Sequence, residues 1–243
     1  MTELHAQTKM LESEPAEWRV RGRLLVKKAR LAVGVALALL LAGCGEPVNH
    51  SRAAYLLLDI SEDYVHELNQ AQALTRYLLA DMTSGDTLGA LFIDNSSYTN
   101  RNVIAQTTFD HRPSVTHHQK RGFLAQVDAF VGGIEVPSAH NDITGGILLA
   151  QERLIDVDAR QRTLYLFSDL QEDRAPWLDR DFPIDLEGIE VVALNVTKLD
   201  SDNSNPRAYG ARLAQWQAWV EESGGNWRVI NDMGQLGHQV ALQ

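Results

Sequence analysis

The sequence predicts an α/β protein with a doubly wound, mostly parallel sheet and helices on both of its faces. From residue 53 onward, short continuous apolar runs alternate with longer segments whose apolar residues recur at helical spacing. Continuous apolar runs are typical of strands that are buried on both faces, as in parallel sheets. No stretch rich in Pro, Gly or Ser divides residues 53–243, so we expect them to form one domain.

The first half of this domain alternates between strand and helix patterns. Its first apolar run ends in Asp59, and the amphipathic segment that follows is closed by the turn-forming residues Ser84, Gly85 and Asp86. A third strand-like run is more polar, which indicates a strand near the edge of the sheet. The expected elements are, in order, a strand at 53–59, a helix at 62–82, and strands at 87–93 and 103–109.

The second half repeats the alternation, and one of its apolar runs also ends in an aspartate, Asp169. The expected elements are helices at 114–131 and 143–155, strands at 163–169 and 189–195, a helix with a stripe at Tyr209, Leu213, Trp216 and Val220, and a strand at 227–230. In doubly wound sheets, ligands bind outside the carboxyl ends of the strands. A functional site is therefore expected where the strands end in Asp59 and Asp169.

Residues 1–43 have the pattern of a secretory signal. They hold seven Lys and Arg against four Asp and Glu, and the basic segment leads directly into an apolar run at 31–41. The fourteen residues 31–44 would span about 21 Å as a helix, which is less than the roughly 30 Å of a membrane's hydrocarbon core. We therefore expect a cleaved signal and not a membrane-spanning helix.

The tetrapeptide Leu41-Ala42-Gly43-Cys44 resembles the lipobox of bacterial lipoproteins, whose cysteine is lipidated and becomes the mature amino terminus. The resemblance implies a lipid anchor at Cys44, followed by a short tether over residues 44–52. Each buried methylene of an acyl chain contributes about 0.8 kcal/mol, so several chains make a stable anchor. Gly45 stands where such proteins often carry the aspartate that retains them in the inner membrane. The resemblance thus favours the outer membrane, facing the periplasm.

The net charge and the cysteine content exclude some classes of partner and site. The chain has 22 Lys and Arg against 32 Asp and Glu, a net charge of −10, and the 15 basic and 28 acidic residues after position 43 leave −13 for the mature part. Such acidity argues against a nucleic-acid partner. A single cysteine excludes intramolecular disulfides and multi-cysteine zinc sites.

Oxygen-bearing side chains gather directly after the first strand, in Asp59-Ile60-Ser61-Glu62-Asp63. Alternate residues of an extended segment point to the same side, so Asp59, Ser61 and Asp63 can converge. Carboxylate and hydroxyl oxygens are hard ligands that suit Mg²⁺ or Ca²⁺. The sequence therefore predicts a divalent-cation site at this strand end.

This pattern resembles the von Willebrand factor A (vWA) family, which carries Asp-x-Ser-x-Ser after its first strand, a threonine before a later helix, and an aspartate after its fourth strand. Asp63 stands where the family has its second serine, and Asn141 stands where it has the threonine. The resemblance covers roughly residues 53–240 and implies a Rossmann-like fold with a metal-ion-dependent adhesion site. The residues it implies as ligands are Asp59, Ser61, Asp63, Asn141, Asp142 and Asp169.

The function expected from these features is that of a membrane-anchored lipoprotein whose vWA-like domain binds a protein partner through Mg²⁺ or Ca²⁺. No catalytic pair or triad is visible, so we do not expect an enzyme. One alternative is a metal-free structural scaffold in a cell-envelope assembly, in which Asp59 and Asp169 cap helices or bind loop amides. The other is a Mg²⁺-dependent phosphohydrolase, but its general acid is missing because Ser61 occupies that position.

Overall fold

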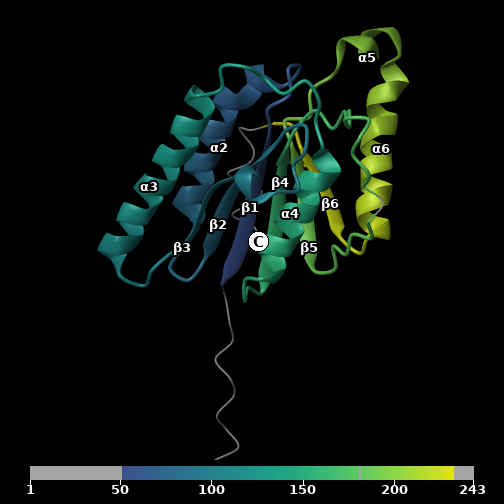
Figure 1. Ribbon diagram of the computed structural model, residues 1–243. Helices are drawn as coiled ribbons and strands as arrows, with labels where there is room; N and C mark the ends of the chain where they lie inside the picture. The colour runs from purple at the N-terminus through teal and green to yellow at the C-terminus, as the bar shows by residue number, and fades with distance from the viewer. Residues whose placement is uncertain (1–50, 181, 233–243) are drawn as a thin grey trace, which may run out of the picture. The chain divides into compact units, whose positions relative to one another are not determined.

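The computed structural model describes residues 51–180 and 182–232 (Figure 1). The expected signal segment, Cys44, most of the tether and residues 233–243 lie outside the described residues. The described residues all belong to one compact unit. Within the two described ranges, no helix is both long enough and apolar enough to cross a membrane.

Within the described residues, six strands form one sheet in the order β3-β2-β1-β4-β5-β6. Their bounds are β1 Arg52–Asp59, β2 Thr87–Ile93, β3 Val103–Thr108, β4 Gln161–Phe167, β5 Ile189–Leu194 and β6 Asn226–Ile230. All neighbouring strands run parallel except β2 and β3. The strand order reverses between β1 and β4, as in doubly wound folds. The predicted fold class is confirmed.

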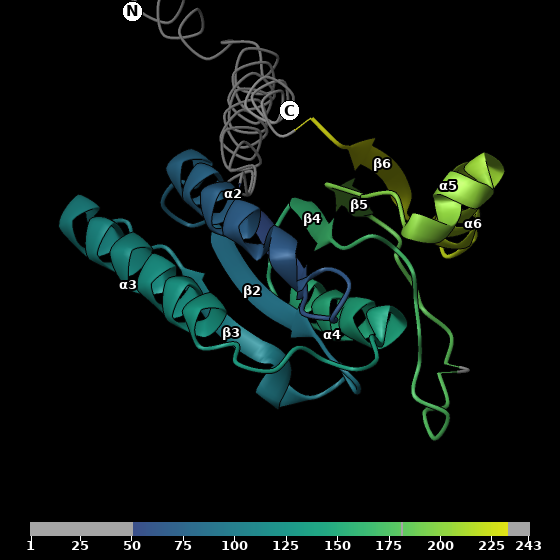
Figure 2. The same ribbon diagram turned by 90° about the horizontal axis from the view of Figure 1, so that it is seen from above.

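Helices cover both faces of this sheet (Figure 2). Their bounds are α2 Leu68–Asp81, α3 Pro113–Gly132, α4 Ile143–Ile155, α5 Asp200–Ser204 and α6 Pro206–Glu222, with 3-10 turns at Val65–Glu67 and Asn100–Asn102. Side chains alternate across β1, so Leu56 packs with Leu74 of α2 in one core, while Leu57 packs with Ile147 of α4 and Val220 of α6 in the other. Burial on both faces accounts for the continuous apolar runs in the sequence.

The differences from the expected elements lie at element ends. The helix expected at 62–82 begins at Leu68, because the carbonyl of Ser61 accepts hydrogen bonds from the amides of Tyr64 and Val65 and closes a tight turn first. The strand expected at 163–169 ends at Phe167, so Ser168 and Asp169 leave the ladder. The short helix α5 was not expected.

One close contact inside the sheet requires a glycine. The ring of Tyr55 on β1 lies over Gly89 on β2, and a Cβ atom at position 89 would come within 2.1 Å of that ring. Both residues occupy the paired position Tyr55↔Gly89 of the parallel ladder. The absence of a side chain at Gly89 is therefore what lets Tyr55 pack fully buried.

The connection between β4 and β5 is unusual for parallel strands, which are normally joined through a helix. Residues 168–180 and 182–188 form no helix. Seen from above, this connection, in green, loops outward between α4 and α6 (Figure 2). Long connections without secondary structure are commonly functional, and this one begins at the edge where Asp59 and Asp169 lie.

Candidate metal centre

Asp59 is the last residue of β1 and is fully buried. Its Oδ1 accepts a hydrogen bond from the amide of Ser61 at 2.9 Å. Its Oδ2 accepts from the hydroxyl of Ser168 at 2.7 Å and from Nδ2 of Asn141 at 3.2 Å. The carboxylate therefore joins the end of β1 to the segments that follow β4 and precede α4.

Asp169 is buried at the same edge, with 2% of its surface exposed, and its Oδ1 accepts from the amide of Gln171 at 2.8 Å. Burial raises the pKa of Asp169 to about 6, and the negative charges of Asp59 and Asp63 act in the same direction. Burial also raises the pKa of Asp59, against the hydrogen bonds from Ser168 and Ser61. Both carboxylates are thus destabilised in their charged forms.

The donor atoms at this edge are of the kind that Mg²⁺ and Ca²⁺ prefer. Asp59 and Asp169 are buried, Ser61 is 8% exposed, and Asp63 is exposed and lines a pocket of about 500 Å³ together with Asp169. In the part of the chain that the structure describes, no Lys or Arg forms an ion pair with Asp59 or Asp169. A cation would stabilise both charges.

The carboxylates alone do not make a full coordination shell. Across residues 51–180 and 182–232, no three His, Cys, Asp or Glu side chains gather in an arrangement that could hold a metal ion. A cation at Asp59 and Asp169 would therefore depend on hydroxyl oxygens such as that of Ser61 and on water. Mg²⁺ commonly binds in this way, through one or two carboxylates and several waters.

Asn141, expected as an oxygen ligand, uses its side chain differently. Its Oδ1 accepts from the amide of Asp173 at 2.5 Å, and its Nδ2 donates to the carbonyl of Gln171 at 2.8 Å as well as to Asp59. The group that Asn141 turns toward Asp59 is therefore a donor and not a metal ligand. Its role in the structure is to hold the connection after β4 against the end of β1.

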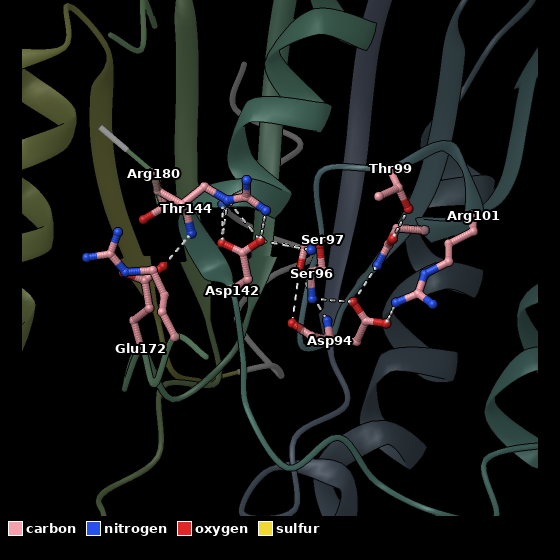
Figure 3. Close-up of polar contacts among 12 residues, drawn as sticks. Asp94, Ser96, Ser97, Thr99, Arg101, Asp142, Thr144, Glu172 and Arg180 are labelled. Carbon is pink, nitrogen blue, oxygen red and sulfur yellow. Dashed lines mark hydrogen bonds and ion pairs between the residues drawn. The ribbon is translucent and has the colours of Figure 1, made fainter. Parts of the chain in front are cut away.

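Asp142, expected as another ligand, belongs to a polar cluster with Ser97 and Arg180 (Figure 3). Its Oδ1 caps α4 by accepting from the amide of Gly145 at 3.0 Å, and its Oδ2 accepts from the amide of Ser97 at 2.9 Å. The same carboxylate forms an ion pair with Arg180 at 2.5 Å, with both side chains almost fully buried. Asp142 therefore fastens the β4–β5 connection to α4, with its charge compensated.

Sequence reasoning missed two further residues at this edge. Arg212 of α6 donates to the carbonyl of Asp169 at 3.0 Å and forms an ion pair with Asp202 at 3.0 Å. The indole of Trp216 donates to the carbonyl of Leu170 at 2.9 Å, where the backbone has a positive φ of 65°. A helical stripe could indicate that Trp216 faces the sheet, but nothing in the sequence pairs either residue with the segment after β4.

Together, these features define a doubly wound α/β domain with buried carboxylates at the carboxyl ends of β1 and β4. No protein-family model matches the sequence, and no curated protein matches it. Similar folds occur among solved structures.

One similar structure is an aerotolerance-related membrane protein from Bacteroides fragilis, with 14% identity, a TM-score of 0.45, and coverage of 78% of this chain and 96% of that one. Another is BatB from Bacteroides thetaiotaomicron, with 10% identity, a TM-score of 0.47, and coverage of 78% and 95%. A third is a von Willebrand factor type A protein from Catenulispora acidiphila, with 10% identity and a TM-score of 0.42. Its alignment covers 78% of this chain but 41% of that one.

Proposed function

We propose that this chain is a lipid-anchored envelope protein whose domain binds a protein partner through a divalent cation. Asp59, Ser61 and Asp169 would hold the cation, and Asp63 would stand at the mouth of the site. The observation that carries this proposal is the burial of Asp59 and Asp169 at one sheet edge, where burial and mutual repulsion raise the pKa of Asp169 to about 6. Mg²⁺ or Ca²⁺ would neutralise this arrangement.

Calorimetric titration of the mature chain carrying Cys44→Ser, with Mg²⁺ and then Ca²⁺, tests the cation site. We expect binding that Asp169→Asn weakens at least about tenfold, since one ligand and one charge are lost. Asp173→Asn is the matched control, because Asp173 lies on the same connection but its side chain is 66% exposed and bonds to His140. No binding of either cation, or equal losses in both variants, would overturn the proposal.

Partner binding is tested by capture from envelope extracts, with and without a chelator. Capture that the chelator and Asp59→Ala both abolish supports the cation-dependent function. We propose no catalytic role, because Ser61 stands where a phosphohydrolase of this architecture needs its general acid.

The anchor rests on the leader sequence, and Cys44 lies outside the described residues. We propose that Cys44 is lipidated and that the absence of aspartate at Gly45 directs the protein to the outer membrane, facing the periplasm. Metabolic labelling with palmitate tests this directly. Cys44→Ser is expected to abolish the label and release the protein from membranes, whereas persistent membrane association of that variant would refute it.

A metal-free scaffold is the second candidate, and one observation favours it. The two oxygens of Asp59 already accept three hydrogen bonds, from Ser61, Ser168 and Asn141. These bonds satisfy the carboxylate without a cation. Under this alternative, the chelator would leave partner capture unchanged, and Asp59→Ala would reduce it only by destabilising the fold.

A further inference from the structure

A continuous groove leads away from the candidate metal centre along α6. It begins at the pocket lined by Asp63 and Asp169, which shares Gln171 with a second hollow of about 620 Å³. The second hollow shares Glu172 and Trp216 with a third, of about 650 Å³. We call this feature the α6 groove, since α6 forms one wall of its second and third parts and the β4–β5 connection forms the other.

The wall opposite α6 is held in place by polar contacts. Arg180 is paired with Asp142, and Oε1 of Glu172 accepts from the amide of Thr144 at 2.7 Å (Figure 3). At the base, the indole of Trp216 donates to the carbonyl of Leu170. A groove with fixed walls loses little conformational freedom when it binds a ligand.

The far end of the groove combines aromatic rings with carboxylates. Trp216 and Trp219 meet edge to face with ring centroids 5.3 Å apart, and both line the third hollow. Glu172 and Glu222 line the same hollow. Tryptophan faces attract ammonium and guanidinium groups, and nearby carboxylates strengthen that attraction.

The lining of the groove holds more acidic than basic side chains, and the excess lies in its first and third hollows, whereas the second hollow holds two of each. The groove's seven carboxylates outnumber its four basic side chains; the carboxylates are Asp63, Asp169, Glu172, Asp179, Asp200, Asp202 and Glu222, and the basic residues are Arg174, Arg180, Lys198 and Arg212. Arg212 and Arg174 form ion pairs with Asp202 and Glu172, which also line the groove, so these pairs leave the excess of negative charge unchanged. Arg180 is paired with Asp142, which does not line the groove, and this pairing adds to the negative excess of the lining. The groove therefore complements a positively charged ligand.

We propose that the α6 groove binds an extended, basic segment of the partner protein, with a Lys or Arg side chain placed against Trp216 and Trp219 near Glu222. An extended segment suits three hollows that follow one another through shared lining residues, and alternate side chains of such a segment point to the same side. This inference names the chemistry of the partner in the proposed function, but it needs no cation at Asp59 and Asp169.

The test uses the mature chain with Cys44→Ser and two short peptides, one alternating glycine with arginine and one alternating glycine with glutamate. Fluorescence anisotropy of the labelled peptides is measured with Mg²⁺ and again with a chelator. The arginine peptide is expected to bind in both conditions, more weakly as salt is raised, and the glutamate peptide is expected not to bind.

Two neighbouring glutamates of α6 give a matched pair of variants. Glu222→Gln removes a carboxylate from the groove and should weaken binding of the arginine peptide about threefold to fivefold. Glu221 does not line any of the three hollows and bonds to Gln217, so Glu221→Gln makes the same charge change elsewhere and should leave the affinity within about twofold. Trp219→Leu should weaken binding of the arginine peptide by a factor similar to that of Glu222→Gln. If Trp219→Leu does not fold, the comparison of Glu222→Gln with Glu221→Gln still tests the groove proposal.

Equal binding of the two peptides, or equal effects of Glu222→Gln and Glu221→Gln, would overturn the groove proposal. A failure of the cation titration, with arginine-peptide binding intact in the chelator, would instead overturn only the metal-dependent function. The two proposals can therefore fail separately.

Discussion

Replacing Asp142 separates its structural role from a role in metal binding. Asp142→Asn keeps an oxygen that can cap the amide of Gly145, but its Nδ2 cannot accept from Ser97 and carries no charge to pair with Arg180. Asp142→Ala removes the cap as well.

The expected magnitudes follow from the burial of the pair. Asp142 is fully buried, and the side chain of Arg180 is 8% exposed. Breaking a buried pair from one side costs about 3–5 kcal/mol, and because Arg180 borders the α6 groove and can turn toward water, we take about 3 kcal/mol for Asp142→Asn. Loss of the cap adds about 1 kcal/mol in Asp142→Ala. For a domain of this size, the asparagine variant should melt roughly 10 °C lower.

Urea unfolding followed by tryptophan fluorescence measures these changes, and cation titration of the same variants measures affinity. The double variant Asp142→Asn/Arg180→Met should lose less stability than the sum of the single variants, with a coupling of about 2 kcal/mol. Mg²⁺ affinity should stay unchanged in Asp142→Asn wherever the protein is folded. A stability loss below about 1 kcal/mol, or an affinity loss equal to that of Asp169→Asn, would refute the assigned role of Asp142.

Two further predictions concern the frame of the domain. Gly89→Ala should lower the free energy of unfolding in urea by about 3 kcal/mol, because the new Cβ would overlap the ring of Tyr55. Gly122→Ala, in an open position on α3, should instead raise the free energy of unfolding by up to about 1 kcal/mol. Equal effects of the two substitutions would contradict the packing argument. Burial alone would raise the pKa of Asp86, but Arg52 and two backbone amides outweigh it and hold that pKa below its ordinary value. Since the folded-state pKa lies below the unfolded value of about 3.9, Asp86 contributes stability above that pH and loses it as the pH falls toward the folded-state pKa. Unfolding free energies measured from neutral pH to pH 3 should therefore decline less steeply in Asp86→Asn than in the parent, and parallel declines would contradict this assignment.

The order and type of most strands and helices could be predicted, because strands that are buried on both faces appear in the sequence as continuous apolar runs. β2 and α4 have the expected bounds, and β1 differs by one residue at its start. The five-residue helix α5 has no apolar stripe from which a helix could be predicted. α2 begins later than expected because of backbone hydrogen bonds to the carbonyl of Ser61. The periodicity of apolar side chains cannot predict such backbone bonds.

The position of the two buried carboxylates could be predicted from the sequence, but the role of each neighbouring side chain could not. Asp59 is the last residue of β1, and Asp169 lies two residues after the end of the neighbouring parallel strand β4, so sequence and topology together bring them to one edge. Asp142 and Arg180 lie 38 positions apart, and only the path of the β4–β5 connection joins them. Likewise, the orientation of the Asn141 amide is set by the backbone of Gln171 and Asp173, which no motif encodes.

The central position of β1, the strand that Arg52 begins, determines how the domain would respond to a pulling force. It opens β1, and its guanidinium binds both Asp81 and Asp86. β1 is held by parallel ladders to β2 on one side and β4 on the other. Tension applied at the amino end of β1 would act along the strand, so the bonds of both ladders would resist in shear together. A domain anchored through Cys44, as proposed, would thus be pulled on a central strand and not peeled from an edge such as β6.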